Sequence, residues 1–594
     1  RYPLGGRMIS LLGLYAALSG GAQAASFSWY QLIPGFEDGG TVAHAGSGTL
    51  TLAGGVTVTT NGGIINNVNG AATLSASLAG NGPLHFLANA TTLTGDNSAF
   101  TGPIRIGNGQ PGTLVINSPA RLGAAPATFQ TNHLALNRGT LQTTATMTLD
   151  EPTRGILLDV SGGTFNVNAG TTLTLASPLA SPNLGANIFA GSLRKAGAGT
   201  LILASSNSAF NGGVFVDTGS TSANDGILRI ARPHVLANAR SPIFIRNNNS
   251  GSSTLQLDGT AGGITLSQNF SLAGRNTATA ALQNLAGTNS LNGGISVNVG
   301  GGNYLLQSDA GQLNLGGTLT SAATGTRTFT FQGGGDFNVT GVIANGSATV
   351  NVVKSGAGRL TLAGANSYTG ATTVNGGTLL VNGSISTGAT VAAGTLGGTG
   401  TLNGNVNVQS GATLAPGTDG IGRLTVNGNV TLAGGSVSTF EIRKTPTTND
   451  VLVVNGSLQC GGTLTITLLH GSPAAGDAFP LFQAGTVTGA FAATNLPPLG
   501  PGLAWNFDGT SGVLSVVSAV NPAPTNLLFS VSGGSLTLAW PASHTGWRLQ
   551  TQTNPLAEGL GTNWFDVPGA TTTNSITFPL NPDDPAVFYR LMYP

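Results

Sequence analysis

Charged side chains are scarce in this sequence: they make up 7% of its 594 residues, compared with about 25% in an ordinary soluble domain. The 21 basic and 20 acidic residues nearly balance, and the formal net charge is +1. Because neither sign dominates, no strong field attracts nucleic acid, and we expect no nucleic-acid partner. Intrinsic disorder is excluded as well, since it requires high charge and low hydrophobicity, whereas 40% of these residues are apolar.

Cysteine is almost absent. The single cysteine, Cys460, excludes an intrachain disulfide and any zinc site built from several cysteines. The six histidines are far apart in the sequence, and none pairs at metal-ligand spacing: His44, His85, His133, His234, His470 and His544. We therefore expect neither a metal site nor a cofactor-binding site.

Long apolar runs are also missing, and the most apolar segment is near the start. Arg1 and Arg7 precede a short apolar stretch from Ile9 to Leu18, and Ala22-Gln23-Ala24 has the small-x-small pattern of a cleavage site. A transmembrane helix needs about 20 apolar residues, so this stretch is too short. Residues 1–24 are predicted to be a signal peptide, cut after Ala24 or one residue later, which leaves no integral membrane segment in the mature chain. The alternative is a buried N-terminal helix.

Glycine, by contrast, is abundant, with 93 residues. Thr, Asn and Val are frequent as well, whereas the strong helix formers Glu and Lys are few. No strict Gly-x-y period is present, so the glycines do not indicate collagen. This composition predicts an all-β protein in which many short strands are joined by Gly/Asn turns.

Three stretches share one sequence pattern. In the first, Lys354 begins Lys-x-Gly-x-Gly-x-Leu-x-Leu, Asn366 begins Asn-x-Tyr-x-Gly, and Gly-Thr-Leu-x-Val follows up to Val381. The second runs from Lys195 to Ile230, and its lysine and asparagine have the same separation as those of the first. The third, residues 97–116, lacks the Lys-x-Gly start. The spacing indicates a repeated structural unit.

Alternation inside these units predicts strands with one buried face. Leu360 and Leu362 flank Thr361, so the two leucines point to one side of a strand. Gly and Asn between the strands accept the backbone conformations that tight corners require. Units of strand and turn that recur this closely predict the coils of a parallel β-helix, at roughly 20 residues per coil.

The series Lys-x-Gly-x-Gly-x-Leu-x-Leu, Asn-x-Tyr-x-Gly and Gly-Thr-Leu-x-Val resembles the autotransporter-associated β-strand repeat, found in passenger-type proteins. The resemblance implies a right-handed parallel β-helix (a solenoid) displayed outside a bacterial cell. A complete autotransporter also ends in a translocating β-barrel, and we expect none after the helix here.

The changes of composition along the chain predict its domains. Residues 25–520 are predicted to form the β-helix with its caps, of which Ser26–Gly40 is the candidate N-terminal cap and 430–518 the C-terminal cap. After a linker at Asn521–Pro524, residues 521–594 contain several short strand-like runs that predict a small antiparallel β-sandwich. This module resembles a fibronectin-type module. Its three tryptophans are expected in the core: Trp540, Trp547 and Trp564.

Parallel β-helices also include polysaccharide lyases and hydrolases, and glycoside hydrolysis needs two carboxylates facing one groove. The neighbouring pairs Glu37-Asp38, Asp150-Glu151 and Asp583-Asp584 cannot share a groove from within one strand, because adjacent residues point to opposite faces. Other carboxylates could converge across coils, although their spacing does not require it: Asp159, Asp217, Asp225, Asp258 and Asp336. Neither a phosphate-binding Gly-Lys-Ser/Thr loop nor a Gly-x-Ser-x-Gly nucleophile motif occurs. We therefore assign no catalytic, cofactor-binding or metal-binding residue.

Together these features predict an exported, non-enzymatic structural or adhesin-like β-helical repeat protein of the bacterial cell surface. The mature chain is expected to be secreted or held at the cell surface or outer envelope, with glycans or cell-surface components as partners. The alternative is a carbohydrate-active β-helix enzyme of the polysaccharide lyase or hydrolase kind.

Overall fold

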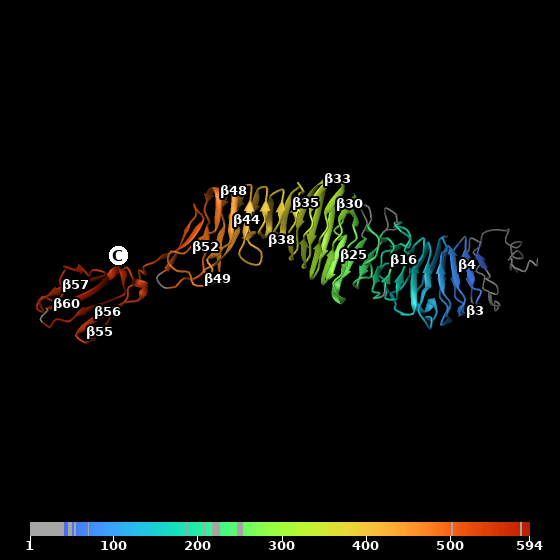
Figure 1. The fold of residues 1–594 in the computed structure, drawn as a ribbon, viewed down its shortest axis with the longest axis horizontal. Coiled ribbons are helices and arrows are strands. Elements are labelled where there is room, and N and C mark those ends of the chain that lie inside the picture. Colours follow the sequence, from blue (N-terminus) through green and yellow to red (C-terminus); the bar gives the residue numbers. More distant parts are fainter. Residues whose placement is uncertain are drawn as a thin grey trace, which may run out of the picture. The chain divides into compact units, whose positions relative to one another are not determined.

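A computed structural model describes residues 41–44, 50–52, 55–68, 70–185, 187–206, 208–216, 226–245, 253–500, 503–582 and 585–593. The predicted signal peptide and the candidate N-terminal cap therefore lie outside the described residues. The chain divides into two compact units, Arg1–Thr390 and Val391–Pro594 (Figure 1).

The first unit is built of coils whose strands pair in parallel with the strands of the next coil. One column of paired strands comprises β1 (Thr41–His44), β4 (Gly63–Asn67), β7 (Leu84–Ala88), β10 (Ile104–Ile106), β12 (Gln130–Leu136), β15 (Arg154–Leu158), β18 (Leu179–Ala180) and β21 (Ser208–Ala209). A second comprises β8 (Ala90–Leu93), β11 (Gly112–Ile116), β13 (Gly139–Thr143), β16 (Gly163–Val167), β19 (Leu193–Ala196), β22 (Val214–Val216), β24 (Ile243–Ile245), β27 (Phe270–Gly274), β30 (Ile295–Gly300) and β33 (Leu319–Gln332). The all-β parallel solenoid predicted from the repeats is confirmed.

Two further columns complete the coils. One comprises β14 (Met147–Leu149), β17 (Thr172–Leu175), β20 (Thr200–Leu203), β23 (Ile227–Ile230), β25 (Thr254–Asp258), β28 (Leu282–Ala286) and β31 (Asn303–Ser308). The other comprises β26 (Thr265–Leu266), β29 (Thr288–Leu291), β32 (Gln312–Leu315), β34 (Asp336–Val339), β36 (Arg359–Leu362) and β38 (Thr372–Val381).

Ladders of apolar side chains fill the interior of the coils. Val339, Leu362 and Val381 occupy equivalent positions in three successive coils, and each is 0% exposed. The intervening residue Thr361 is only half-buried, as the alternation predicts. Full burial of one such apolar side chain contributes about 1.5–3 kcal/mol, so the stacked ladders are the main source of stability.

Coil length varies more than the sequence pattern indicates. Leu360 pairs with Leu379, whereas Ile104 pairs with the more distant Leu134, so the coil after Ile104 is the longer of the two. This longer coil contains the 3₁₀ helix η3 (Pro119–Leu122). The coil length expected from the repeats therefore describes only the shortest coils. Longer coils carry insertions at their corners, and these insertions leave the paired strands in register.

Parallel coils continue in the second unit. β42 (Val406–Val408), β45 (Val430–Leu432), β48 (Val451–Cys460) and β51 (Phe482–Gly489) form one run of paired strands. β43 (Thr413–Pro416), β46 (Val437–Arg443), β49 (Thr463–His470) and β52 (Ala493–Asn495) form another. β50 (Ala478–Pro480), β54 (Val513–Ser518) and β53 (Leu503–Asp508) instead pair antiparallel. The region predicted as a C-terminal cap is therefore largely made of further coils.

The last strands form two small antiparallel sheets, as predicted. One contains β55 (Leu528–Ser532), β56 (Ser535–Ala539) and β59 (Ser575–Pro579), and the other β58 (Phe565–Asp566), β57 (Arg548–Asn554) and β60 (Ala586–Met592). Leu538 and Trp540, from the segment of β56, share a core with Leu549 of β57. Trp547 is buried as well, whereas Trp564 is only half-buried and lies under the Arg590 guanidinium. The expectation of three core tryptophans is thus correct for two of them.

Candidate functional site

Three of the carboxylates considered for catalysis accept hydrogen bonds from backbone amides, and that of Asp336 comes from the next coil. Asp159 Oδ1 accepts a hydrogen bond from the Val160 amide at 2.8 Å, and Asp258 caps a short 3₁₀ helix. Asp336 Oδ1 accepts from the Arg359 amide at 2.8 Å. Glu37, Asp38, Asp217, Asp225, Asp583 and Asp584 lie outside the described residues. Among the described carboxylates on this list, none is brought against another.

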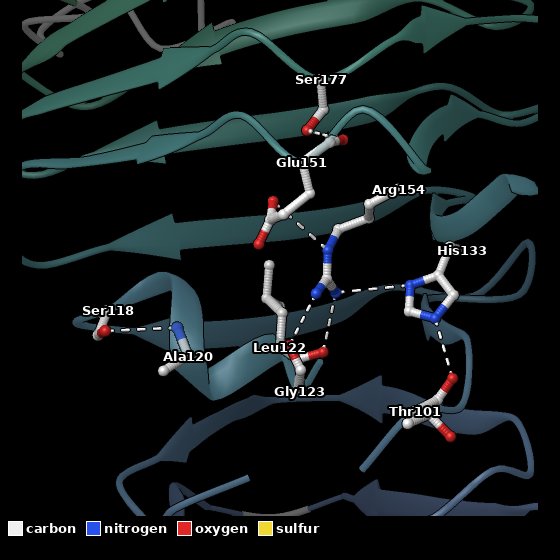
Figure 2. Close-up of polar contacts among 9 residues, drawn as sticks. All are labelled: Thr101, Ser118, Ala120, Leu122, Gly123, His133, Glu151, Arg154 and Ser177. Carbon is white, nitrogen blue, oxygen red and sulfur yellow. Dashed lines mark hydrogen bonds and ion pairs between the residues drawn. The ribbon is translucent and has the colours of Figure 1, made fainter. Parts of the chain in front are cut away.

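The pair Asp150-Glu151 adjoins the most elaborate buried polar cluster, which Figure 2 shows. Arg154, at the start of β15, is only 1% exposed, and its Nη1 and Nη2 donate to the carbonyl oxygens of Leu122 and Gly123 at 2.9 and 2.7 Å. Its Nε lies 3.6 Å from Glu151 Oε2. The guanidinium therefore satisfies carbonyls at the C-terminal end of η3, in the preceding long coil.

His133 of β12 lies against the same guanidinium (Figure 2). Its Nε2 is 3.1 Å from the Thr101 carbonyl oxygen, and its Nδ1 is 3.5 Å from Arg154 Nη1. Because a carbonyl only accepts, Nε2 carries the proton and the neutral ring leaves Nδ1 free to accept from the guanidinium. Burial lowers the pKa of His133, and the nearby Arg154 charge acts in the same direction. The cluster is suited to joining neighbouring coils.

The lysines that begin the repeats are buried at coil corners. Lys354 is 1% exposed, and its Nζ donates to the carbonyl oxygens of Ser355, Gly356 and Gly376 at 2.7, 2.8 and 3.3 Å. Burial lowers the pKa of Lys354 to about 8, so the ammonium is still charged at pH 7. Lys195 is fully buried and donates in the same way to Ala196 and Gly197. The two glycines of Lys-x-Gly-x-Gly thus belong to a turn that wraps around an ammonium group.

The motif asparagines connect adjacent coils. Asn366 Oδ1 accepts from the Ile343 amide of the preceding coil at 2.9 Å, and its Nδ2 donates to the Ser384 carbonyl of the next coil at 3.0 Å. Asn97, in the third stretch, joins the Leu78 amide and the Arg121 carbonyl in the same manner. Both asparagines are buried. Their side chains pair backbone groups at corners where the strand ladders are interrupted.

Sequence reasoning identified these positions as a pattern but did not assign their role. The acceptors of Lys354 include its own turn, which the spacing of the two glycines could have indicated. The partners of Asn366 lie 23 and 18 residues away in the chain. They could be found only once the register of the coils was known.

Rows of hydrogen-bonded polar side chains run along the coils. Gln256 Nε2 donates to Gln283 Oε1 at 2.9 Å, and Gln283 Nε2 donates to Asp309 Oδ2 at 2.7 Å. In the second unit, Asn455 Nδ2 donates to Asn427 Oδ1, and Asn427 Nδ2 donates to Asn403 Oδ1, both at 2.7 Å. Hydrogen-bonding groups are thus held in rows along the coils.

Two hollows open on the first unit. One, of about 430 Å³, is lined by Thr288, Gln312, Asp336 and three glycines. The other, of about 650 Å³, includes Arg275, Asn303 and Thr328, and the Arg275 guanidinium is already engaged by the carbonyls of Ser253, Thr279 and Ala280. Neither lining contains the two carboxylates that glycoside hydrolysis requires.

Comparison with known proteins places the repeat motifs in a known family of repeats. A family model described as "Passenger-associated-transport-repeat" matches residues 193–230 and 352–381. Both segments are thus similar to passenger repeats. They contain the buried Lys195 and Lys354, so the corner structure around these lysines is a feature of the matched repeats.

Two individual proteins are similar to parts of this chain. A segment of 128 residues, 22% of the chain, is 38% identical to the "Adhesin BmaC autotransporter" of Brucella suis biovar 1 (strain 1330) and spans 3% of that protein's length. The crystal structure of the Haemophilus influenzae Hap adhesin aligns with 80% of this chain and 64% of the Hap chain, at 12% identity and a TM-score of 0.25. The assignment of the repeats to a family thus rests on the two segments that the family model matches.

The described residues offer neither a metal cluster nor a membrane-spanning helix. No three His, Cys, Asp or Glu side chains among them are grouped so that they could hold a metal ion. In the same residues, no helix is long and apolar enough to cross a membrane.

Proposed function

We propose that this chain is an exported, non-enzymatic repeat protein of the bacterial cell surface with an adhesin-like role. The 38% identity with part of an autotransporter adhesin, together with the two passenger repeats, is the observation that carries the proposal. The rows of polar side chains along the coils support it, because many weak hydrogen bonds along a repetitive surface add up to strong attachment.

The proposal includes a location and a division of the chain. Residues 1–24 direct export and are removed, residues 25–520 form the β-helix with its caps, and residues 521–594 form a linked β-sandwich module. The mature protein is secreted or held at the outer envelope, where glycans or other cell-surface components are its partners. The pattern of Arg1, Arg7 and Ala22-Gln23-Ala24 supports export and removal of residues 1–24.

Adhesion of coated beads tests the proposed role. Beads carrying purified residues 25–594 are expected to attach to bacterial or host cells in numbers well above beads carrying an unrelated β-rich protein of similar size. Attachment no greater than that of the control beads, over a range of cell types, would contradict an adhesin-like role.

The carbohydrate-active alternative is tested separately, with the same protein and a panel of acidic and neutral polysaccharides. We expect no release of unsaturated or reducing ends, because Asp159, Asp258 and Asp336 already accept hydrogen bonds from backbone amides. Release of such ends from any polysaccharide would favour the enzyme.

A further inference from the structure

A short stack of aromatic rings stands on the outer face of the first unit. Phe215 of β22 and Phe244 of β24 occupy paired outward positions, and their ring centroids are 5.0 Å apart with an interplanar angle of 1°. Phe189 lies over Phe215 at 5.5 Å and 8°. Outward positions of this solenoid mostly carry small polar residues, so three stacked rings are a local exception.

Phe189 is the end of the stack that faces solvent. It is 60% exposed, whereas Phe215 and Phe244 are 3% and 7% exposed. Leu184, in the same loop, is 44% exposed. Phe215 and Phe244 are therefore buried beneath Phe189, and of the three rings Phe189 alone is open to a partner.

The loop that carries Phe189 is held in place by Arg240. Arg240 Nη1 donates to the Asn187 carbonyl at 2.8 Å, Nη2 donates to Asn183 Oδ1 at 3.3 Å, and Nε donates to the Asn211 carbonyl at 2.6 Å. Asn187 Oδ1 in turn accepts from the Phe189 amide at 3.0 Å. The ring is thus fixed before any partner arrives, which reduces the entropy lost on binding.

Two exposed asparagines belong to the same loop as the exposed ring. The side chains of Asn183 and Asn187 are exposed, and each uses its oxygen as described above. Within the described part of the chain, neither side-chain NH₂ group donates a hydrogen bond. A loop that exposes an aromatic ring and two available amide donors is an amphipathic surface.

We propose that Phe189, Asn183 and Asn187 form a sugar-binding platform that takes one pyranose ring of a neutral glycan. One face of a pyranose presents C–H groups that pack on an aromatic ring, and its peripheral hydroxyls accept hydrogen bonds from amides. A purely apolar protein partner fits less well, because covering this surface would leave both amide groups without acceptors. This assignment rests on the proposed function, since it names the partner class of an adhesin-like surface.

The test uses purified residues 25–594 and a panel of immobilised neutral oligosaccharides of hexoses and N-acetylhexosamines, with acidic oligosaccharides beside them. The wild-type protein and Phe189→Trp are expected to bind at least one neutral oligosaccharide. Phe189→Ala and Phe189→Leu should bind it at least about tenfold more weakly, a loss of about 1.4 kcal/mol. Phe189→Leu separates ring stacking from general hydrophobic contact.

Phe129→Ala is the matched control, because Phe129 is 52% exposed and belongs to the same unit. It is expected to bind as the wild type does, and circular dichroism should show all four variants folded. The proposal is overturned if the wild type binds no neutral oligosaccharide, or if Phe189→Ala and Phe129→Ala bind alike. If wild-type beads adhere to cells but the wild-type protein binds no neutral oligosaccharide, the platform fails while the adhesin-like role stands. If wild-type beads do not adhere, the role itself fails.

Discussion

Buried polar residues define the repeat at the scale of single side chains. Removing an ammonium group from water is costly, and it is tolerated only where strong hydrogen bonds compensate. Lys354 meets this condition with three carbonyl acceptors around one corner. Lysine is rare in this sequence, with three in all, and two of the three begin a passenger repeat.

Replacing Lys354 by Met should lower the free energy of unfolding of the first unit by about 2 kcal/mol, because the apolar stem is kept while three carbonyl oxygens at the corner lose their shared charged donor. Urea unfolding followed by circular dichroism measures the loss. Arg232→Met, at an exposed position, is the control and is expected to leave the midpoint unchanged. Equal midpoints for Lys354→Met and the wild type would show that the corner does not depend on the ammonium.

Asn366→Leu should lower the free energy of unfolding by more, about 3 kcal/mol, because it leaves a buried amide of one coil and a half-buried carbonyl of the next without their partner. The same urea unfolding experiment measures this loss, and Asn292→Leu, at an exposed position, is the control. A smaller loss for Asn366→Leu than for Asn292→Leu would refute the role of Asn366 in joining coils.

At the scale of elements, the strands could be predicted from the sequence and the corners could not. Alternation such as Leu360-Thr361-Leu362 fixes which face of a strand is buried, and stacking of equal strands follows from it. The corners depend on longer-range contacts. The η3 insertion is held by Arg154, which lies in a different coil, and no local pattern around Pro119–Leu122 reveals that partner.

The coil that contains η3 should respond to pH through His133. The folded state favours the neutral ring, so its pKa lies below the ordinary histidine value of 6.5. In the unfolded chain the ring takes up a proton near pH 6.5, whereas in the folded state it does so only at lower pH. The contribution of His133 to stability is therefore complete above pH 6.5 and is lost as the pH falls below 6.5.

Urea unfolding of the wild type and His133→Gln at pH 7.5 and pH 5 measures this effect. The wild type is expected to lose more stability than His133→Gln between the two pH values, since glutamine keeps a donor for Thr101 but does not titrate. His234→Gln, at an exposed histidine, should keep the pH dependence of the wild type. The same loss in all three proteins would argue against a buried neutral His133.

The candidate functional surface was less predictable than the fold. Glycans were expected as partners from the class of protein, yet Phe189 could not be singled out among 23 phenylalanines. Its exposure and its stacking on Phe215 depend on Arg240, 53 residues from Asn187 in the chain. Side chains that recognise a partner are placed by such contacts, which carry no signature in a single sequence.

At the scale of the whole molecule, few charges and many glycines have one cause. Coils stacked in register need small residues at their corners and uncharged residues in their outer ladders. The proposed role in attachment uses the repetitive surface of such coils and needs few ionisable side chains. A role in attachment requires the chain to reach the outside of the cell.

Labelling intact cells with antibodies against residues 253–500 tests this requirement most directly. Cells that produce the full sequence are expected to be labelled without permeabilisation, or to release the protein into the medium, with residues 1–24 removed as determined by mass spectrometry. An uncleaved protein that is labelled only after the cells are permeabilised would contradict an exported surface adhesin.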